Sequence, residues 1–270
     1  MKRPLCVAHL TAIDLPPPAF IEAAARAGFD GVGLRVLRVT DTSPGYPLQN
    51  DPAMLRATKQ ALQMTGLRVM DIEFLRITPE TRAEDFDRAL DAGAELGARH
   101  VITAPYDDDL SRLSDTLAQL ALRATERGIS PVLEFFPWTS VPDLTTAQSV
   151  VERAGDTVGI LVDALHFNRS NSSLNDLAAI APHRLPFAHL CDAQVQPQYS
   201  VDQLLHTARA ERLPPGEGQI DLSAFIAALP VGTPLTAEVP MAELMQSLGA
   251  DGVLSKVYAA TKRLVDGGAG

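Results

Sequence analysis

The sequence predicts a single closed (β/α)8 TIM barrel that takes up all of residues 1–270. Three observations support this fold. The chain has 270 residues, and α/β barrels commonly use about 250 residues as one domain. Hydrophobic residues make up 46% of the chain and charged residues 21%, which is enough apolar material for one large core. Glycines recur roughly every thirty residues, each between a helical pattern and a short apolar run: Gly28, Gly66, Gly97, Gly128 and Gly155.

Eight short apolar runs predict the strands. They are dense in Val, Ile and Leu rather than strictly alternating, as expected for parallel strands that are covered on both faces. The glycine after a helical pattern suits the left-handed residue that ends a helix, because glycine has no Cβ. The predicted strands are residues 4–10, 31–37, 67–75, 100–105, 131–136, 158–163, 185–191 and 234–239.

Helical patterns fill the spaces between these runs. Leu110, Leu113 and Leu117 lie three and four residues apart, which places them on one face of a helix. Asp221 is predicted to be the N-cap of a later helix. An open doubly wound sheet is the alternative fold, but it usually has a glycine-rich phosphate loop after an early strand. The segment HLTAIDLPPP (residues 9–18) contains no such loop.

Two connections between the predicted elements are long. Residues 40–52 follow the second strand and residues 192–219 follow the seventh, so both lie on the side of the carboxyl ends of the strands. Loops of this length in a compact fold are often lids or binding loops. The sequence alone leaves open whether they serve that purpose or only decorate the barrel.

Charge and composition exclude several classes of partner. The chain has 23 Lys and Arg against 33 Asp and Glu, a net charge of −10, which argues against binding to nucleic acid or to an anionic membrane surface. No apolar run approaches the ~18 residues of a membrane span, and residues 1–18 do not form a signal peptide. We therefore expect a cytoplasmic protein in which Cys6 and Cys191 are buried, reduced thiols. Homo-oligomerisation is left open.

Polar residues interrupt the last four predicted strands. Glu134, Asp163, His189 and Glu238 each lie at or near the carboxyl end of one of them. Any one of these residues alone would more often be solvated or paired with a basic side chain. An ionised carboxylate is very costly to bury alone, so three of them with an imidazole at one barrel mouth need a positive charge between them. The pattern predicts one divalent metal ion, and mixed oxygen and nitrogen ligands suit Mn, Mg, Co or Zn.

Four further residues are candidates for binding a substrate. His166 follows Asp163 closely and is either a substrate contact beside the metal or a hydrogen-bonded loop histidine. Arg212 is a cation for the substrate, a partner for a carboxylate, or a solvated arginine. Glu73 and His9 occupy analogous positions on the third and first predicted strands.

With the four polar strand residues and the segments around them, the chain resembles the xylose isomerase-like TIM-barrel superfamily. Within it, the chain is most similar to the sugar phosphate isomerase/epimerase group, which includes ketose 3-epimerases and inosose dehydratases. The resemblance covers essentially the whole chain, and its most specific motifs are VDALHFNRS (162–170), AHLCDA (188–193), LPPGEGQIDL (213–222) and LTAEVP (235–240).

This resemblance implies a site and an activity. It implies that one divalent metal is held by the four polar strand residues, that His166 contacts the substrate, and that Arg212 matches an arginine before a P-G-x-G loop. It implies a divalent-metal-dependent isomerase or epimerase that acts on a sugar, sugar phosphate or keto-polyol by proton abstraction next to a metal-bound carbonyl. In the epimerases, residues matching Glu134 and Glu238 move the protons through an enediolate.

The chain departs from the epimerases after the seventh strand, and other functions remain to be weighed. Twenty-one residues run from Asp192 to Arg212, so the lid and the substrate pocket are expected to differ. The first alternative is a metal-dependent lyase or dehydratase of a keto-sugar or keto-inositol. A non-catalytic barrel is a further alternative. A DNA repair endonuclease of this superfamily needs many histidines and a basic groove, and six histidines with a charge of −10 argue against it.

Overall fold

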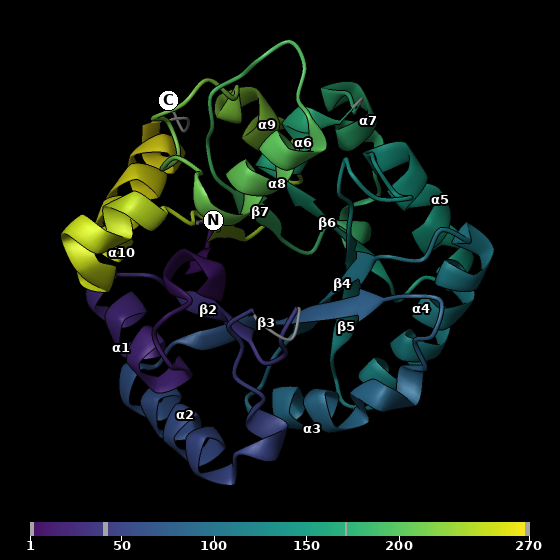
Figure 1. The fold of residues 1–270 in the computed structure, drawn as a ribbon, viewed down its shortest axis with the longest axis horizontal. Coiled ribbons are helices and arrows are strands. Elements are labelled where there is room, and N and C mark those ends of the chain that lie inside the picture. The colour runs from purple at the N-terminus through teal and green to yellow at the C-terminus, as the bar shows by residue number, and fades with distance from the viewer. Residues whose placement is uncertain (1–2, 40–42, 171, 268–270) are drawn as a thin grey trace.

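Eight parallel strands close into a barrel, which confirms the predicted (β/α)8 fold (Figure 1). The computed structural model describes residues 3–39, 43–170 and 172–267. Neighbouring strands pair in chain order, and β8 pairs back onto β1 through Leu5 and Leu235. The strands are β1 Leu5–Val7, β2 Gly31–Arg35, β3 Arg68–Ile77, β4 His100–Pro105, β5 Ser130–Glu134, β6 Gly159–Asp163, β7 Ala188–Leu190 and β8 Leu235–Ala237.

Each predicted strand region contains an observed strand, but several bounds differ. Strand β1 ends at Val7, because the chain turns into the 3-10 helix His9–Ala12. Strand β3 runs on to Ile77, beyond its predicted end. Strand β8 ends at Ala237, so Glu238 follows the strand directly rather than lying in it.

Helices surround the barrel and cover its outer face (Figure 1). Helix α1 ends at Gly28, whose φ of 106° places it in the left-handed region that favours glycine. The predicted N-cap at Asp221 is present, since its side chain accepts a hydrogen bond from the Ala224 N–H at 3.0 Å. The α-helices are α1 Pro17–Ala27, α2 Pro52–Thr65, α3 Asp87–Glu95, α4 Leu110–Thr125, α5 Leu144–Ala154, α6 Ala164–Arg169, α7 Leu174–Ala179, α8 Val201–Ala210, α9 Leu222–Ala228 and α10 Ala242–Gly267.

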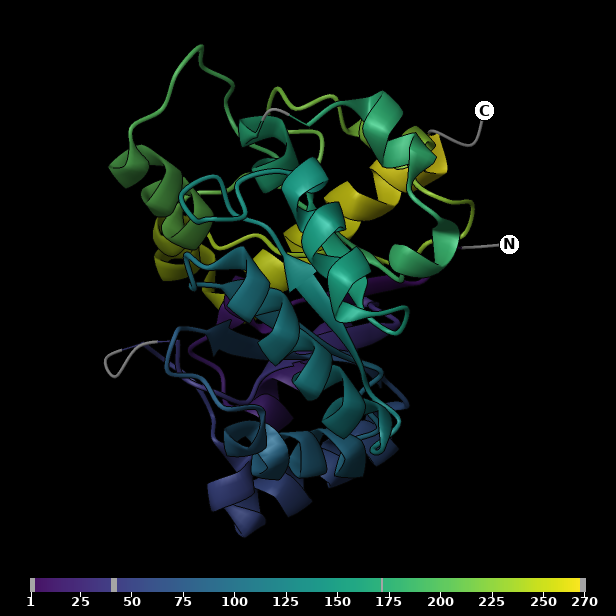
Figure 2. The same cartoon turned by 90° about the vertical axis from the view of Figure 1, so that its right-hand side faces the viewer.

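Helix α8 lies inside the long connection that the sequence placed at residues 192–219. A capping box begins it: the Ser200 side chain accepts from the Gln203 backbone, and the Gln203 side chain accepts from the Ser200 backbone. Figure 2 shows α8 and the loop before it projecting beyond the barrel on one side. The connection is therefore an ordered helical wall at the end of the barrel where the strands finish.

The interior of the barrel has an apolar layer beneath a polar one. The apolar layer is a separate cluster of buried side chains, and the polar residues of the site lie nearer the carboxyl ends of the strands. Cys6 belongs to this layer, and both it and Cys191 are buried and form no disulfide, as predicted. The apolar layer consists of Cys6, Met70, Ile102, Val132, Leu161 and Phe187.

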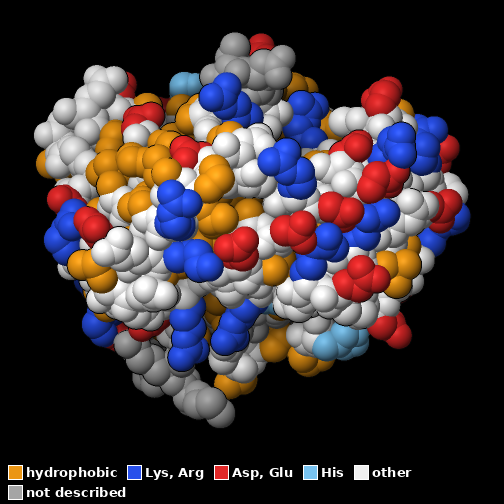
Figure 3. All heavy atoms as spheres, turned by 90° about the horizontal axis from the view of Figure 1, so that it is seen from below, with side chains coloured by type: hydrophobic (Ala, Val, Ile, Leu, Met, Phe, Trp, Pro, Cys, Tyr) orange, Lys and Arg blue, Asp and Glu red, His pale blue; other side chains and the backbone are white. Residues whose placement is uncertain are grey.

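The outer surface mixes charges of both signs. On the face formed by helices α2 and α3, acidic and basic side chains lie among one another (Figure 3). Arg127 pairs with Asp91 at 2.6 Å, and Lys59 pairs with Glu95 at 3.2 Å. Within the described part of the chain, no helix is both long enough and apolar enough to cross a membrane.

Candidate metal centre

The fold brings together the four polar residues that interrupt the last four strands. Glu134 ends β5, Asp163 ends β6, His189 lies in β7, and Glu238 follows β8. One potential ligand atom from each residue lies within 4.8 Å of those from the other three. All four side chains are buried, so they form one compact group at the mouth of the barrel.

The imidazole of His189 lies at the centre of this group. Its Nδ1 is 3.5 Å from Glu238 Oε2 and 3.8 Å from Asp163 Oδ2. The same nitrogen is 4.0 Å from Glu134 Oε1. Neither His189 Nδ1 nor Glu134 Oε1 has a hydrogen-bond partner among the described residues. Buried polar atoms are normally satisfied, and a set of carboxylate oxygens around one imidazole nitrogen fits a divalent cation.

Arg212 holds two of these carboxylates in place. Its Nη1 donates to Asp163 Oδ2 at 2.6 Å, and its Nη2 lies 2.8 Å from Glu238 Oε2. Its Nε donates to the carbonyl of Ala208 in α8 at 3.1 Å. Of the roles that the sequence left open for Arg212, the structure therefore shows that of a partner for carboxylates.

Asp163 is also oriented by the helix that follows it. Its Oδ1 accepts hydrogen bonds from the backbone N–H groups of Leu165 at 2.8 Å and His166 at 3.1 Å, so it is the N-cap of α6. One oxygen thus faces the helix and the other faces Arg212 and His189. Burial raises the pKa of this carboxyl, but Arg212, His166 and His189 together outweigh burial and lower the pKa below its usual value.

The pKa values of the other three side chains shift in different directions. Burial raises the pKa of Glu134 well above its usual value. Burial lowers the pKa of His189, but Glu238, Glu134 and Asp163 together raise it to about 10. For Glu238 burial raises the pKa, and the charges of Arg212 and His189 more than reverse this. A divalent ion would displace the protons on Glu134 and His189, because metal ligands bind in their deprotonated forms.

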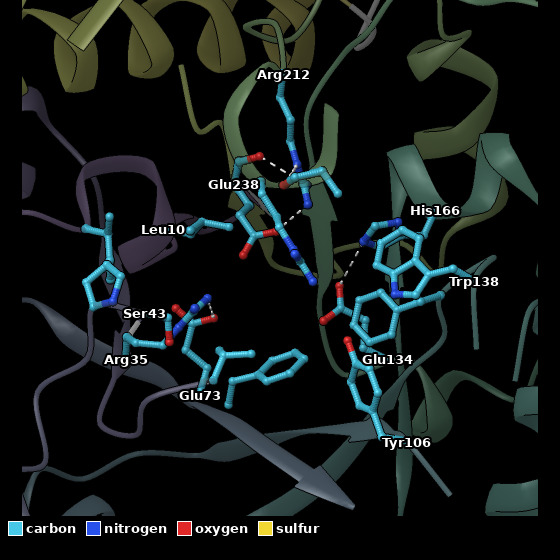
Figure 4. A pocket seen from close by; sticks show the side chains of 17 residues that line it. Leu10, Arg35, Ser43, Glu73, Tyr106, Glu134, Trp138, His166, Arg212 and Glu238 are labelled. Carbon is cyan, nitrogen blue, oxygen red and sulfur yellow. Dashed lines mark hydrogen bonds and ion pairs between the residues drawn. The ribbon is translucent and has the colours of Figure 1, made fainter. Parts of the chain in front are cut away.

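A pocket of about 300 Å³ opens beside the cluster (Figure 4). Its volume is at the lower end of small-molecule sites. Glu73, His166 and Arg212 line it, as do two of the clustered carboxylates, Glu134 and Glu238. Aromatic side chains form much of its wall: Phe74, Tyr106, Phe136 and Trp138.

His166 stands between the aromatic wall and the cluster. Its ring packs edge-on against Phe136 and Trp138, with centroids 4.8 and 5.2 Å away. Its Nε2 lies 3.9 Å from Glu134 Oε1, and its Nδ1 has no partner among the described residues. Burial lowers the pKa of His166 to about 4, so the neutral ring can both donate and accept a hydrogen bond.

His9, by contrast, does not line the pocket. Because β1 ends early, its ring is turned into the core, where it stacks on Phe20 at 4.4 Å and on Tyr46 at 5.2 Å. Its Nδ1 accepts the backbone N–H of Arg35 at 3.1 Å, and its Nε2 lies 2.9 Å from the Leu15 carbonyl. Both nitrogens are therefore used within the protein, and His9 supports the end of β2 rather than reaching a substrate.

Comparison with known proteins identifies the family. The model of the xylose isomerase-like TIM barrel matches residues 21–253. The chain belongs to the xylose isomerase-like TIM barrel family. An inosose isomerase from Bacillus velezensis is 23% identical over 225 residues, which cover 77% of each chain.

Solved structures of low sequence identity share this fold. A crystal structure of the IolI protein with a zinc atom has a TM-score of 0.82 at 19% identity, and covers 98% of this chain and 99% of its own. A D-psicose 3-epimerase structure determined with D-fructose has a TM-score of 0.73 at 15% identity, and covers 98% of this chain and 99% of its own.

In this xylose isomerase-like protein, Arg35 is a pocket residue that was not predicted from the sequence. It ends β2 and is buried, and its Nη2 donates to Glu73 Oε2 at 3.0 Å. Arg35 Nε and Glu73 Oε1 have no partner among the described residues, although both side chains line the pocket. The sequence does contain a signal for Arg35, because it is a charged residue at the carboxyl end of an apolar strand.

Both long connections of this family member contribute to the pocket. The first connection contributes Ser43 and Pro44, and Val39 lies directly before it. The second connection contributes Ala208 and Arg209. Residues 40–42 of the first connection lie outside the described residues. The two segments therefore shape the pocket rather than only decorating the barrel.

Proposed function

We propose that the protein is a divalent-metal-dependent isomerase or epimerase that acts on a sugar, a sugar phosphate or a keto-polyol. The observation that carries this proposal is the group of three carboxylates and one imidazole within 4.8 Å of one another, beside a small-molecule pocket. The name of the Bacillus velezensis relative, inosose isomerase, and the zinc atom in the similar IolI structure support it.

Glu134, Asp163, His189 and Glu238 would hold the ion. When bound, a divalent ion supplies a Lewis acid that polarises a carbonyl and lowers the pKa of the neighbouring hydroxyl and C–H. Arg212 keeps Asp163 and Glu238 in position through its two ion pairs.

The proton transfers are assigned to two glutamates. Glu134 and Glu238 come from opposite ends of the four-strand segment that carries the cluster, and both line the pocket. Figure 4 shows their carboxylates pointing toward the same space. One would remove the proton from the carbon beside the carbonyl, and the other would return a proton to that carbon or its neighbour.

The far side of the pocket suits a polyhydroxylated substrate. The Arg35–Glu73 pair is neutral overall, yet it keeps one unpartnered donor and one unpartnered acceptor, which is what a hydroxyl group requires. The aromatic wall opposite, with Phe136 and Trp138, can pack against the C–H face of a ring. Figure 4 shows Arg35 and Glu73 on one side of the pocket and Tyr106 and Trp138 on the other.

The test combines metal content with turnover. We expect one divalent ion per purified chain, and loss of that ion in His189→Ala. With keto-sugars and keto-inositols in deuterated water, we expect products that differ from the substrate only in configuration or carbonyl position and that carry solvent deuterium. Glu134→Gln should lower kcat by about 10²–10⁴ while leaving the fold intact by circular dichroism.

Glu243→Gln, on an exposed position of α10, is the matched control and should keep full activity. A metal-loaded protein that neither converts these substrates nor exchanges their hydrogens with solvent would contradict the proposal.

A dehydratase is the second candidate function. It begins with the same proton abstraction, and it also needs an acid for the departing hydroxyl. The glutamic acid formed by that abstraction can supply this proton, and the neutral ring of His166 can orient the hydroxyl, since its Nδ1 is unpartnered and its Nε2 is 3.9 Å from Glu134. Loss of water from the product mass, together with new absorbance from an enone, would favour the dehydratase over the isomerase.

A further inference from the structure

Asp71 is a buried acid that the proposed chemistry does not use. It lies in β3, two residues before Glu73, so both side chains point to the same face of the strand. Glu73 lines the pocket, which places Asp71 one layer deeper inside the barrel. Its side chain lies over Gly33 of β2, where an added Cβ would be 2.6 Å from Asp71 Oδ1. Asp71 is fully buried, and neither carboxyl oxygen has a partner among the described residues.

Two other unpartnered polar atoms lie in the same region. His189 Nε2, on the side of the ring away from the carboxylates, has no partner among the described residues, and neither has Thr236 Oγ1. His189 and Thr236 are paired in the β7–β8 register, so their side chains are neighbours, and both are fully buried. Strands β3 and β7 lie opposite each other in the closed eight-stranded barrel, and Asp71 and His189 are both fully buried, so the two side chains face each other across the barrel interior.

We propose that Asp71 is a positioning residue for the metal centre: together with Thr236, and through one buried water molecule, it accepts the hydrogen bond of His189 Nε2–H. No direct hydrogen bond joins Asp71 to His189, and a water bridging these three groups would have three polar partners, a usual number for an internal water. This inference rests on the proposed metal site.

The physical role is to choose the tautomer of His189. A neutral imidazole has one N–H, and only the other nitrogen can bind a metal. An acceptor held at Nε2 keeps the proton there and leaves Nδ1, the nitrogen that faces the three carboxylates, free to coordinate. It also fixes the orientation of the ring.

A role in stability does not explain Asp71. No described Lys or Arg side chain forms an ion pair with it, and burial raises its pKa to about 8 despite the opposing charge of His189. A buried carboxyl without a partner costs folding free energy. Its removal should therefore weaken metal binding without weakening the metal-free fold, whereas the removal of a structural residue would weaken both.

The test measures zinc affinity by competition with a chelator, together with thermal unfolding of the metal-free protein. Asp71→Leu should weaken zinc binding by about 10–100-fold, and its metal-free midpoint should stay the same or rise. Asp71→Asn, which keeps an acceptor, should lose less affinity, and Thr236→Val should also weaken binding.

Thr103→Val is the matched control, because Thr103 is a buried strand hydroxyl bonded to the Val132 carbonyl at 2.9 Å. It should lower the unfolding midpoint and leave zinc affinity unchanged. Asp71→Leu that binds zinc as tightly as the parent, or that loses affinity and metal-free stability together, would overturn the proposal.

A second readout reports on the histidine itself. In the zinc-loaded protein, ¹⁵N NMR should show His189 protonated at Nε2, with slow exchange of that proton with solvent. Asp71→Leu and Thr236→Val should speed this exchange, and an unchanged exchange rate in both would also overturn the proposal. If the parent itself binds no zinc, or His189→Ala binds it equally well, the proposed metal site fails. If only the Asp71 and Thr236 variants have no effect, the positioning role alone fails.

Discussion

Arg212 can be buried because two carboxylates share its charge. It is 2% exposed, and its guanidinium bonds to Asp163 and Glu238 on neighbouring parts of the cluster. The effect is reciprocal: burial lowers the pKa of Arg212, but its anionic neighbours, Asp163 above all, raise it well above its usual value. The same contacts keep two proposed metal ligands ionised and aimed at the centre of the site.

Removing this charge should destabilise the metal-free protein. Arg212→Met leaves two buried carboxylates without their partner, so we expect the free energy of unfolding to fall by about 3–5 kcal/mol. Saturating zinc should restore part of the loss, because the ion replaces the missing positive charge. Urea unfolding with and without zinc measures both effects. Arg209→Met, an exposed neighbour in α8, should change stability by less than about 0.5 kcal/mol, and an equal loss in the two variants would contradict this account.

Single residues were predictable where a polar side chain broke an apolar strand. Glu134, Asp163, His189 and Glu238 could be found in this way, since burying them alone would be costly. His9 was placed at the pocket because its strand was expected to continue. The early turn after β1 could not be read from the apolar pattern, and the turn sends the ring into the core.

At the scale of elements, the strands were easier to predict than the connections. Eight apolar runs gave all eight strands, because a parallel strand covered on both faces has to be apolar along its length. Helix α8 was missed, because it is half-exposed and its apolar stripe is narrow. The spacing of Ser200 and Gln203 is a capping-box signal that would have revealed its start.

Loosening α8 should affect the pocket more than the fold. Ser200→Ala removes the capping hydroxyl, which should cost helix α8 about 1 kcal/mol. Since only Ala208 of this helix is buried, we expect the overall unfolding midpoint to change little. Amide hydrogen exchange over residues 201–210 should accelerate several-fold. Ser247→Ala, whose exposed hydroxyl bonds only to Leu244 in its own helix, should leave the exchange in α8 unchanged, and equal protection of α8 in both variants would count against the prediction.

For the molecule as a whole, a buried histidine links stability to pH. Burial lowers the pKa of His9 to about 3, and the nearby charge of Arg35 acts in the same direction against the hydrogen bond to Leu15. The unfolded chain, with a histidine pKa near 6.5, therefore binds more protons below that pH than the folded chain does. The stability that depends on neutral His9 is complete above about pH 6.5 and is lost as the pH falls toward 3.

The size of this effect can be measured directly. Between pH 7.5 and pH 5, His9 should account for roughly 2 kcal/mol of lost stability. His9→Phe keeps an aromatic ring against Phe20 and should flatten the pH dependence by that amount, although it loses the two hydrogen bonds of the imidazole. Urea unfolding with a chelator present gives the two slopes. The exposed His183→Gln should keep the parent's slope, and an unchanged slope in His9→Phe would refute the link.

The closing strand has a consequence for the way the molecule is made. Leu235–Ala237 of β8 pairs with β1 on one side and β7 on the other, and Glu238 comes next. Until the ribosome has synthesised this segment, the nascent chain has two unpaired sheet edges and lacks Glu238, one of the four proposed metal ligands. The proposed set of four ligands is complete only once Glu238 has been synthesised, and chains that stop before β8 would leave two unpaired sheet edges exposed to chaperones and proteases.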